Sequence, residues 1–219
     1  MLAMKTYAFN ALTSAVLAEI ATIRHEPSLP ALWDELGRRE LPESDRVAIG
    51  LVTNKLLYYR SQRVNEATIW ARAIYPLLVL AERGAIRAWS DIPLAARFGE
   101  VEIRGEADGA LAASIDEEVG TPYLVVMEAK RGMAGTDPMP QLLGAMLCAA
   151  RLNEAGGHPA PEVFGCYTIA DVWTFVHGRL DLREARPEMS VTVSGEYAEK
   201  IEAETIVAIL ESIVGKYLA

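Results

Sequence analysis

The hydrophobic pattern of the chain changes its period near Gly99, and this change constrains the fold more than any other feature. Before Gly99, apolar side chains recur every three or four residues, which is the spacing of one helix face. The segments with this spacing are residues 8–23, 45–59 and 65–83. Pro76 lies inside the third segment, where it should kink or loosen the helix. We therefore expect the first 90 residues to be helical.

The part of the chain after this point alternates as strands do. Residues 100–104 and 107–113 are predicted as two short strands, with Gly105 as the break between them. An acidic turn over residues 114–121 leads into a third strand, residues 123–130, whose centre is apolar and β-branched. The remaining predicted elements are a helix over 138–155, a hairpin of strands 163–169 and 172–177, a strand over 189–193 and a helix over 203–218.

These elements together predict an α/β protein with a mixed central sheet flanked by helices. Residues 1–62 should form a helical N-terminal extension packed on a core made by residues 63–219, so that both parts form one body. The most apolar windows, 74–81 and 142–150, are far shorter than the roughly 20 residues that cross a bilayer. No membrane contact is therefore expected.

The charge of the chain limits the partners it can have. Its 219 residues include 21 Lys and Arg against 30 Asp and Glu, a formal net charge of −9. Coating naked nucleic acid needs clustered cations, so the balance argues against that role but leaves room for a local basic groove. The arginines that are either solvated or part of such a groove are Arg60, Arg63, Arg72, Arg83, Arg87, Arg97, Arg104 and Arg131.

The cysteines and histidines carry no recognisable site. Cys148 and Cys166 are the only two cysteines, so we expect buried thiols without a disulfide framework and a cytoplasmic location. His25, His158 and His177 are far apart and lack the spacing of metal ligands, so zinc is not expected.

The end of the strand over residues 123–130 contains the most informative chemistry. Glu128 and Lys130 project from the same face because strand side chains alternate, and an apolar run precedes them. Burying these charges is costly unless they are paired, bound to a metal or exposed to a cleft. If the preceding strand pairs as a hairpin, Asp108 approaches Glu128. Two carboxylates and the Ala129 carbonyl would then offer oxygen ligands for Mg²⁺ or Mn²⁺, with Lys130 beside an incoming phosphate.

A simpler interpretation of the same residues is an ion pair at a strand end on a solvated edge. A Glu two residues before a Lys is by itself a weak signal, because the chain has 30 acidic residues. The apolar strand, the upstream Asp108 and the helix that follows near Gln141 make the metal site the more specific hypothesis.

In their order and context, these residues resemble the PD-(D/E)XK nuclease superfamily. More closely, residues 65–68 and 74–78, residues 105–111 and the Glu128-Ala129-Lys130 strand are similar to the N-terminal endonuclease domain of type I restriction motor subunits. The resemblance covers about residues 65–180. It departs from the family pattern at Ala107, where Pro is common, and at Ala145, where an aromatic residue is often found.

The resemblance implies a restriction-endonuclease-like fold and a Mg²⁺-dependent nuclease acting on DNA. Asp108 and Glu128 would be metal ligands together with the Ala129 carbonyl, and Glu66 would join them from a helix. Lys130 would be the catalytic cation, and Gln141 would orient Lys130 or contact the substrate backbone. A homodimer or a larger complex is expected if both strands are cut. The alternative is a catalytically silent relative that keeps the fold as a binding or assembly module.

Overall fold

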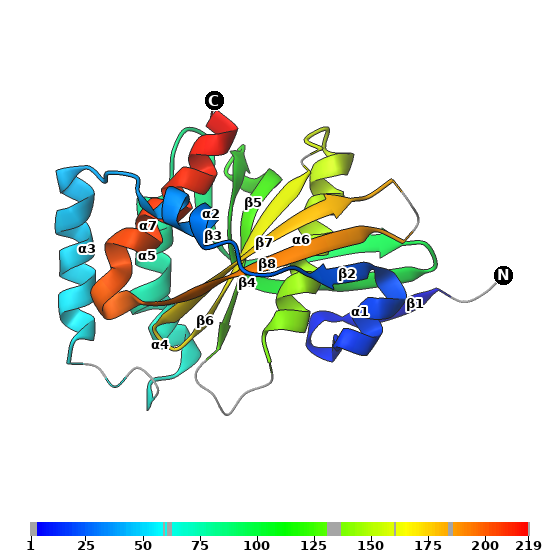
Figure 1. Ribbon diagram of the computed structural model, residues 1–219, viewed down its shortest axis with the longest axis horizontal. Coiled ribbons are helices and arrows are strands. Elements are labelled where there is room, and N and C mark those ends of the chain that lie inside the picture. The colour runs from blue at the N-terminus through cyan, green and yellow to red at the C-terminus, as the bar shows by residue number, and fades with distance from the viewer. Residues whose placement is uncertain are drawn as a thin grey trace.

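A mixed sheet of eight strands organises the chain, and helices cover both of its faces (Figure 1). The computed structural model describes residues 4–58, 60, 63–130, 137–159, 161–183 and 186–218. The strands are β1 (Lys5–Ala8), β2 (Thr22–His25), β3 (Ile86–Phe98), β4 (Val101–Ile115), β5 (Glu118–Lys130), β6 (Glu162–Ile169), β7 (Val172–Asp181) and β8 (Glu188–Ala198). Their order is β1-β4-β5-β6-β7-β8-β2, and β3 pairs with β4.

The sheet forks at β4, and this fork positions the candidate site. Along one side, β4 pairs with the antiparallel strand β3 for almost its whole length. On its other side, residues 101–104 pair with the parallel strand β1, whereas β5 pairs only from the register Gly109↔Met127 onward. Residues 105–108 of β4 therefore lie in the gap between β1 and β5.

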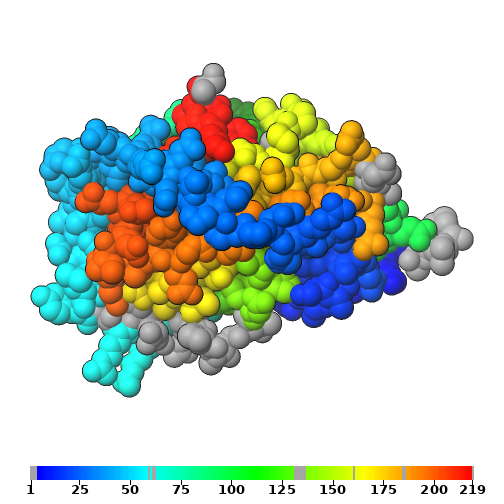
Figure 2. All heavy atoms as spheres, viewed as in Figure 1, coloured from blue at the N-terminus to red at the C-terminus, as the bar shows by residue number. Residues whose placement is uncertain are grey.

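The helices divide between the two faces of the sheet. They are α1 (Ser14–Ile20), α2 (Pro30–Gly37), α3 (Glu43–Leu56), α4 (Glu66–Ile69), α5 (Tyr75–Leu80), α6 (Met139–Ala155) and α7 (Glu199–Leu218), with the short 3₁₀ segment η1 (Phe9–Ala11). α7 packs with α2, α3 and α5 on one face, and α6 covers the strands β5 and β6 on the other. Figure 2 shows the N-terminal segment crossing the molecule beside β8 and α7.

Each face has its own apolar core. Trp33, Phe164 and Phe175 pack together on the α7 side, where the rings of Trp33 and Phe175 stack with centroids 6.0 Å apart. Val126 and Met146 belong to the core beneath α6. Because side chains alternate along β5, this assignment turns Glu128 toward the α6 side and Ala129 toward the α7 side.

The expectation of an N-terminal extension made only of helices is wrong in part. α1 covers only the middle of the predicted helix over residues 8–23, and the strands β1 and β2 lie on either side of it. β1 pairs in parallel with β4, and β2 pairs in parallel with β8. Long-range backbone pairing outweighs the local helical spacing in these two short segments.

The predicted strand break at Gly105 is also wrong, because β4 runs without interruption from Val101 to Ile115. A Cβ at this position would lie 2.5 Å from the Phe9 ring, so the glycine allows close packing between η1 and β4. The strand β3, Ile86–Phe98, was not predicted at all.

Several other predicted helices and strands are confirmed. Pro76 lies at the start of α5, directly after a π-helical turn at Trp70–Ile74, so the helix is loosened there. The predicted helix over 138–155 is α6, and the predicted hairpin forms between β6 and β7. Within the described ranges, no helix is long and apolar enough to span a membrane.

Candidate active site

The structure brings Asp108 and Glu128 together across the β4–β5 hairpin. The last paired residues of the antiparallel ladder are Gly109 and Met127, so Asp108 and Glu128 come directly after it. Asp108 Oδ2 accepts a hydrogen bond from the Ala129 N–H at 2.6 Å. In an extended strand the N–H and C=O of one residue point the same way, so the Ala129 carbonyl also faces the side of Asp108.

Glu128 is buried and forms an ion pair with Lys130. The exposed fraction of the Glu128 side chain is 3%, whereas that of Lys130 is 23%. Lys130 Nζ donates to Glu128 Oε1. Burial and the neighbouring charge of Asp108 raise the pKa of Glu128 to about 7, although the hydrogen bond from Lys130 opposes this rise. Lys130 therefore compensates a carboxylate that is costly to keep charged.

Burial and the neighbouring charges together set the pKa values of Asp108 and Lys130. Burial raises the pKa of Asp108, and the Ala129 N–H and the Lys130 charge only partly oppose this effect. Burial by itself lowers the pKa of Lys130, but its hydrogen bond to Glu128 and the charges of the nearby acids raise it overall. Glu66 contributes to each of these shifts, so its carboxylate belongs to the same electrostatic cluster.

A hollow of about 230 Å³ opens beside Asp108. It is lined by Glu66, Ala67, Trp70, Asp91, Asp108 and Ala129. Asp91 lies opposite Asp108 on β3, where the ladder skips from Ser90↔Gly109 to Ile92↔Ala107, and its φ is +53°. The charge of Asp91 also raises the pKa of Asp108.

Asp91 is a site residue that the sequence analysis missed. The strand β3 alternates buried and exposed side chains except at Ser90 and Asp91, where two exposed polar residues follow one another. The register of β3 with β4 is the same on both sides of this break, so no residue is inserted, and the positive φ of Asp91 interrupts the ladder only locally. This break in the alternation was the signal that could have identified Asp91.

The helix α4 presents Glu66 to this hollow. Asn65 caps the helix by accepting a hydrogen bond from the Thr68 N–H at 2.8 Å. One turn after Glu66, Trp70 Nε1 donates to Ser90 Oγ at 2.9 Å. The Trp70 ring also packs directly over Gly109, where a Cβ would lie 2.3 Å from the ring. These contacts fix the short helix against the two strands that carry Asp91 and Asp108.

Gln141 lies near Lys130, in the first turn of α6. A second hollow, of about 220 Å³, is lined by Phe9, Asn10, Leu12, Lys130, Asp137 and Gln141. Glu66 and Asp108 line the first hollow, and Lys130 and Gln141 line the second. Glu128 contacts Lys130. The structure thus brings five of the predicted side chains to one end of β5.

The donor set fits a hard divalent cation in its chemistry. Carboxylates and a main-chain carbonyl are the oxygen ligands that Mg²⁺ and Mn²⁺ prefer. Burial first, and then the neighbouring acids, raise the pKa of both Asp108 and Glu128. Within the described residues, however, no group of three or more Asp, Glu, His or Cys side chains is arranged to hold a metal. Glu128 faces Lys130, so binding a cation requires Glu128 to exchange this partner.

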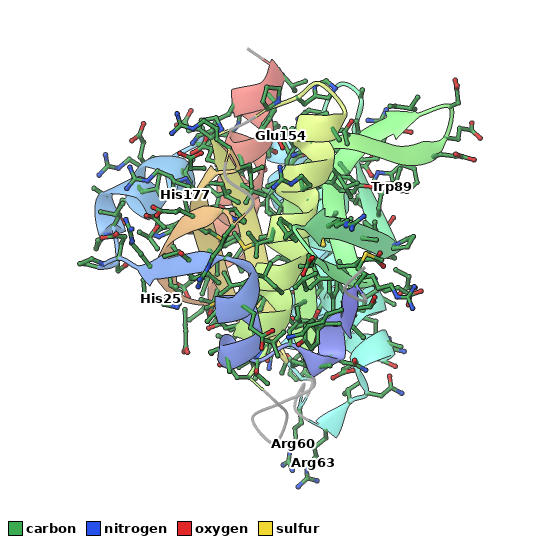
Figure 3. The ribbon with its side chains drawn as sticks, turned by 90° about the vertical axis from the view of Figure 1, so that its right-hand side faces the viewer. His25, Arg60, Arg63, Trp89, Glu154 and His177 are labelled. Carbon is green, nitrogen blue, oxygen red and sulfur yellow. The ribbon has the colours of Figure 1, made fainter. Side chains whose placement is uncertain are left out.

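The other candidate residues contribute no second site. Cys148 and Cys166 are buried, and burial raises the pKa of both thiols, as expected for inert apolar side chains. His177 Nε2 lies 2.8 Å from Glu162 Oε2, and Figure 3 shows His25 in a different part of the molecule. Arg60 and Arg63 project into solvent just before α4 (Figure 3), and Arg131 lies outside the described residues.

No protein-family model matches this chain, and no curated protein matches it. What the site does is therefore inferred from its own side chains.

Proposed function

We propose that this protein is a Mg²⁺- or Mn²⁺-dependent nuclease of the PD-(D/E)XK type that hydrolyses phosphodiester bonds in DNA. The observation that supports this proposal is the contact of Asp108 with the Ala129 main chain, directly beside the buried Glu128–Lys130 pair. Two carboxylates and a lysine at the point where the β4–β5 pairing ends form the set that metal-assisted phosphodiester hydrolysis needs. The same set underlies the proposed restriction-endonuclease-like fold and the likeness to type I motor-subunit nuclease domains.

Each side chain has a defined task in this proposal. Asp108, Glu128 and the Ala129 carbonyl would hold the cation, with Glu66 and Asp91 adding negative charge at the hollow. A divalent cation bound there supplies polarisation of the phosphate and stabilises developing negative charge.

Lys130 supplies the positive charge at the proposed site. Its ammonium, which is paired with Glu128 in this structure, would balance the charge that develops on the phosphate oxygens. Gln141 lies beside the same hollow as Lys130 and orients the lysine or the substrate backbone by hydrogen bonding. One site per chain cuts one strand, so cleavage of both strands requires a dimer or a larger complex. We place the protein in the cytoplasm, because both of its cysteines are free thiols.

A second function is favoured by the ion pair between Glu128 and Lys130. In this arrangement the lysine already neutralises the carboxylate, which suits a protein that keeps the fold without cleaving. The chain would then be a nucleic-acid-binding or assembly module. Its net charge of −9 agrees with a role within a complex.

A cleavage assay with Mg²⁺ or Mn²⁺ on single-stranded, duplex and branched DNA separates the two functions. The nuclease should cut at least one substrate, and Asp108→Asn and Lys130→Ala should each lower the rate by about 100-fold or more. Glu102→Gln is the matched control, because Glu102 lies on the same strand β4 at its pairing with β1. Cleavage that survives both site substitutions, or is absent on every substrate, would refute the nuclease proposal.

A further inference from the structure

The hollow that contains Lys130 continues into a larger one. The larger hollow has a volume of about 630 Å³ and shares Phe9, Asn10 and Gln141 with the hollow beside Lys130. At its far end it is lined by β4 residues Arg104 to Glu106 and by the β3 residues paired with them. We call the two joined hollows the Arg104 groove.

The fork in the sheet creates this groove. On the side away from β3, β4 leaves β1 after Arg104 and meets β5 only at Gly109. The segment η1 bridges this gap, because Phe9 packs on Gly105 and holds Asn10 beside the opening. The result is a groove that begins at Lys130 and follows β4 away from the site.

The polar groups of the groove suit a phosphodiester backbone. Arg104 is exposed, and in the parts of the chain that the structure describes no carboxylate forms an ion pair with it. Asn10 and Gln141 add amide groups that donate hydrogen bonds. Arginine and amide side chains are common partners of backbone phosphates. Glu106 and Asp137 also line the groove and should weaken binding of an anion there.

We propose that the Arg104 groove binds one strand of nucleic acid, with Arg104 contacting a phosphate several nucleotides from the bond at Lys130. This inference rests on the proposed function and extends it to the path of the substrate. Arg104 lies four residues before Asp108 on β4, which is roughly 13 Å at 3.3 Å per residue. Measured along the helix axis of B-form DNA, that length corresponds to about four nucleotides of one strand.

Fluorescence anisotropy in EDTA tests this contact without any metal or cleavage. The probes are labelled single-stranded oligonucleotides of 4 and 12 nucleotides, titrated with the full chain at several salt concentrations. Arg104→Gln should weaken binding of the longer probe about tenfold and lower its log–log salt slope by about 0.7, the value for one phosphate contact. Glu106→Gln should strengthen binding of the same probe, and the shorter probe should be much less affected by either change.

Arg97→Gln is the matched control. Arg97 lies on the same hairpin, donates to the Gly99 carbonyl at 3.1 Å and does not line the groove. An equal affinity and salt slope for Arg104→Gln and Arg97→Gln would overturn the groove contact while leaving the proposed nuclease intact. Binding that depends on Arg104 in a protein that cuts nothing would refute the nuclease and support the groove. Absence of binding by the unmodified chain would overturn the groove contact, whatever the cleavage assay shows.

Discussion

The Asp108 carboxylate accepts a hydrogen bond from the Ala129 N–H at 2.6 Å, at the point where the β4–β5 ladder ends. This contact replaces the next backbone hydrogen bond of the ladder with one from a side chain. It holds a carboxylate beside buried Glu128, although burial and like charge raise the pKa of both acids. A protein that keeps two such acids together forgoes stability at this position for a function that uses their charge.

Asp108→Asn should therefore stabilise the fold while abolishing the proposed activity. The asparagine oxygen can still accept from the Ala129 N–H. A neutral amide avoids the cost of burying a charge and the repulsion from the neighbouring acids, and this gain outweighs the lost attraction to Lys130. We expect the free energy of unfolding to rise by about 1 kcal/mol, measured by chemical denaturation. Asp108→Ala leaves the Ala129 N–H without this acceptor and should lower the same quantity by about 1–3 kcal/mol. A lower stability for Asp108→Asn would show that the carboxylate stabilises the fold.

Gly109→Ala should displace Trp70 and the helix that carries Glu66. The added Cβ would lie 2.3 Å from the Trp70 ring, so the ring must move and its hydrogen bond to Ser90 must lengthen. We expect a loss of about 1–3 kcal/mol in unfolding free energy and a shift in tryptophan fluorescence.

Gly50→Ala provides the contrasting control for this substitution. Gly50 lies in α3 with no atom within 4 Å of a new Cβ, and alanine there should stabilise the helix by about 0.5–1 kcal/mol. If Gly109→Ala left both stability and tryptophan fluorescence unchanged, the proposed anchoring of α4 by Trp70 would be wrong.

The stability of the fold should decrease between about pH 4.5 and pH 7 because of Glu199. This carboxyl is fully buried and accepts a hydrogen bond from Trp173 Nε1 at 2.8 Å, and burial raises its pKa to about 7 from 4.5. The folded protein therefore binds the Glu199 proton more tightly than the unfolded chain does. The stabilising effect of this proton is lost as the pH rises through this window. At pH 8 the free energy of unfolding should be lower by roughly 3 kcal/mol than it is below pH 4.5, as far as Glu199 contributes.

Glu199→Gln should remove this contribution, since a neutral amide can still accept from Trp173. Urea denaturation at pH 5 and at pH 8 measures the effect, with Glu204→Gln on the exposed side of the same helix as the control. The drop in stability from pH 5 to pH 8 should be smaller in Glu199→Gln than in the other two proteins. An equal drop in all three proteins would place the titrating group elsewhere.

Much of the site could be predicted from the sequence because it depends on local rules. Alternation along a strand places Glu128 and Lys130 on one face, and a short turn between two strands makes them antiparallel neighbours, which brings Asp108 to Glu128. The capping residue Asn65 likewise indicates where the helix carrying Glu66 begins.

Other parts of the fold depend on contacts that local patterns do not encode. β1 and β2 are strands only because distant edges of the sheet pair with them in parallel. Gly105 resembles a strand break but serves to admit the Phe9 ring. Asp91 enters the site at a local interruption of the β3–β4 ladder, and the strand β3 was not predicted, so the position of Asp91 depends on the pairing of that strand with β4.

A calorimetric titration of Mn²⁺ into the protein tests most directly whether Asp108 and Glu128 share a cation. We expect one bound ion per chain in the unmodified protein and an affinity at least about tenfold lower in Asp108→Asn, which keeps the fold but loses the charge. Asp116→Asn, in the exposed turn between β4 and β5, should bind Mn²⁺ like the unmodified protein. An unchanged affinity in Asp108→Asn, or no Mn²⁺ binding by the unmodified protein, would contradict the claim that Asp108 and Glu128 share a divalent cation.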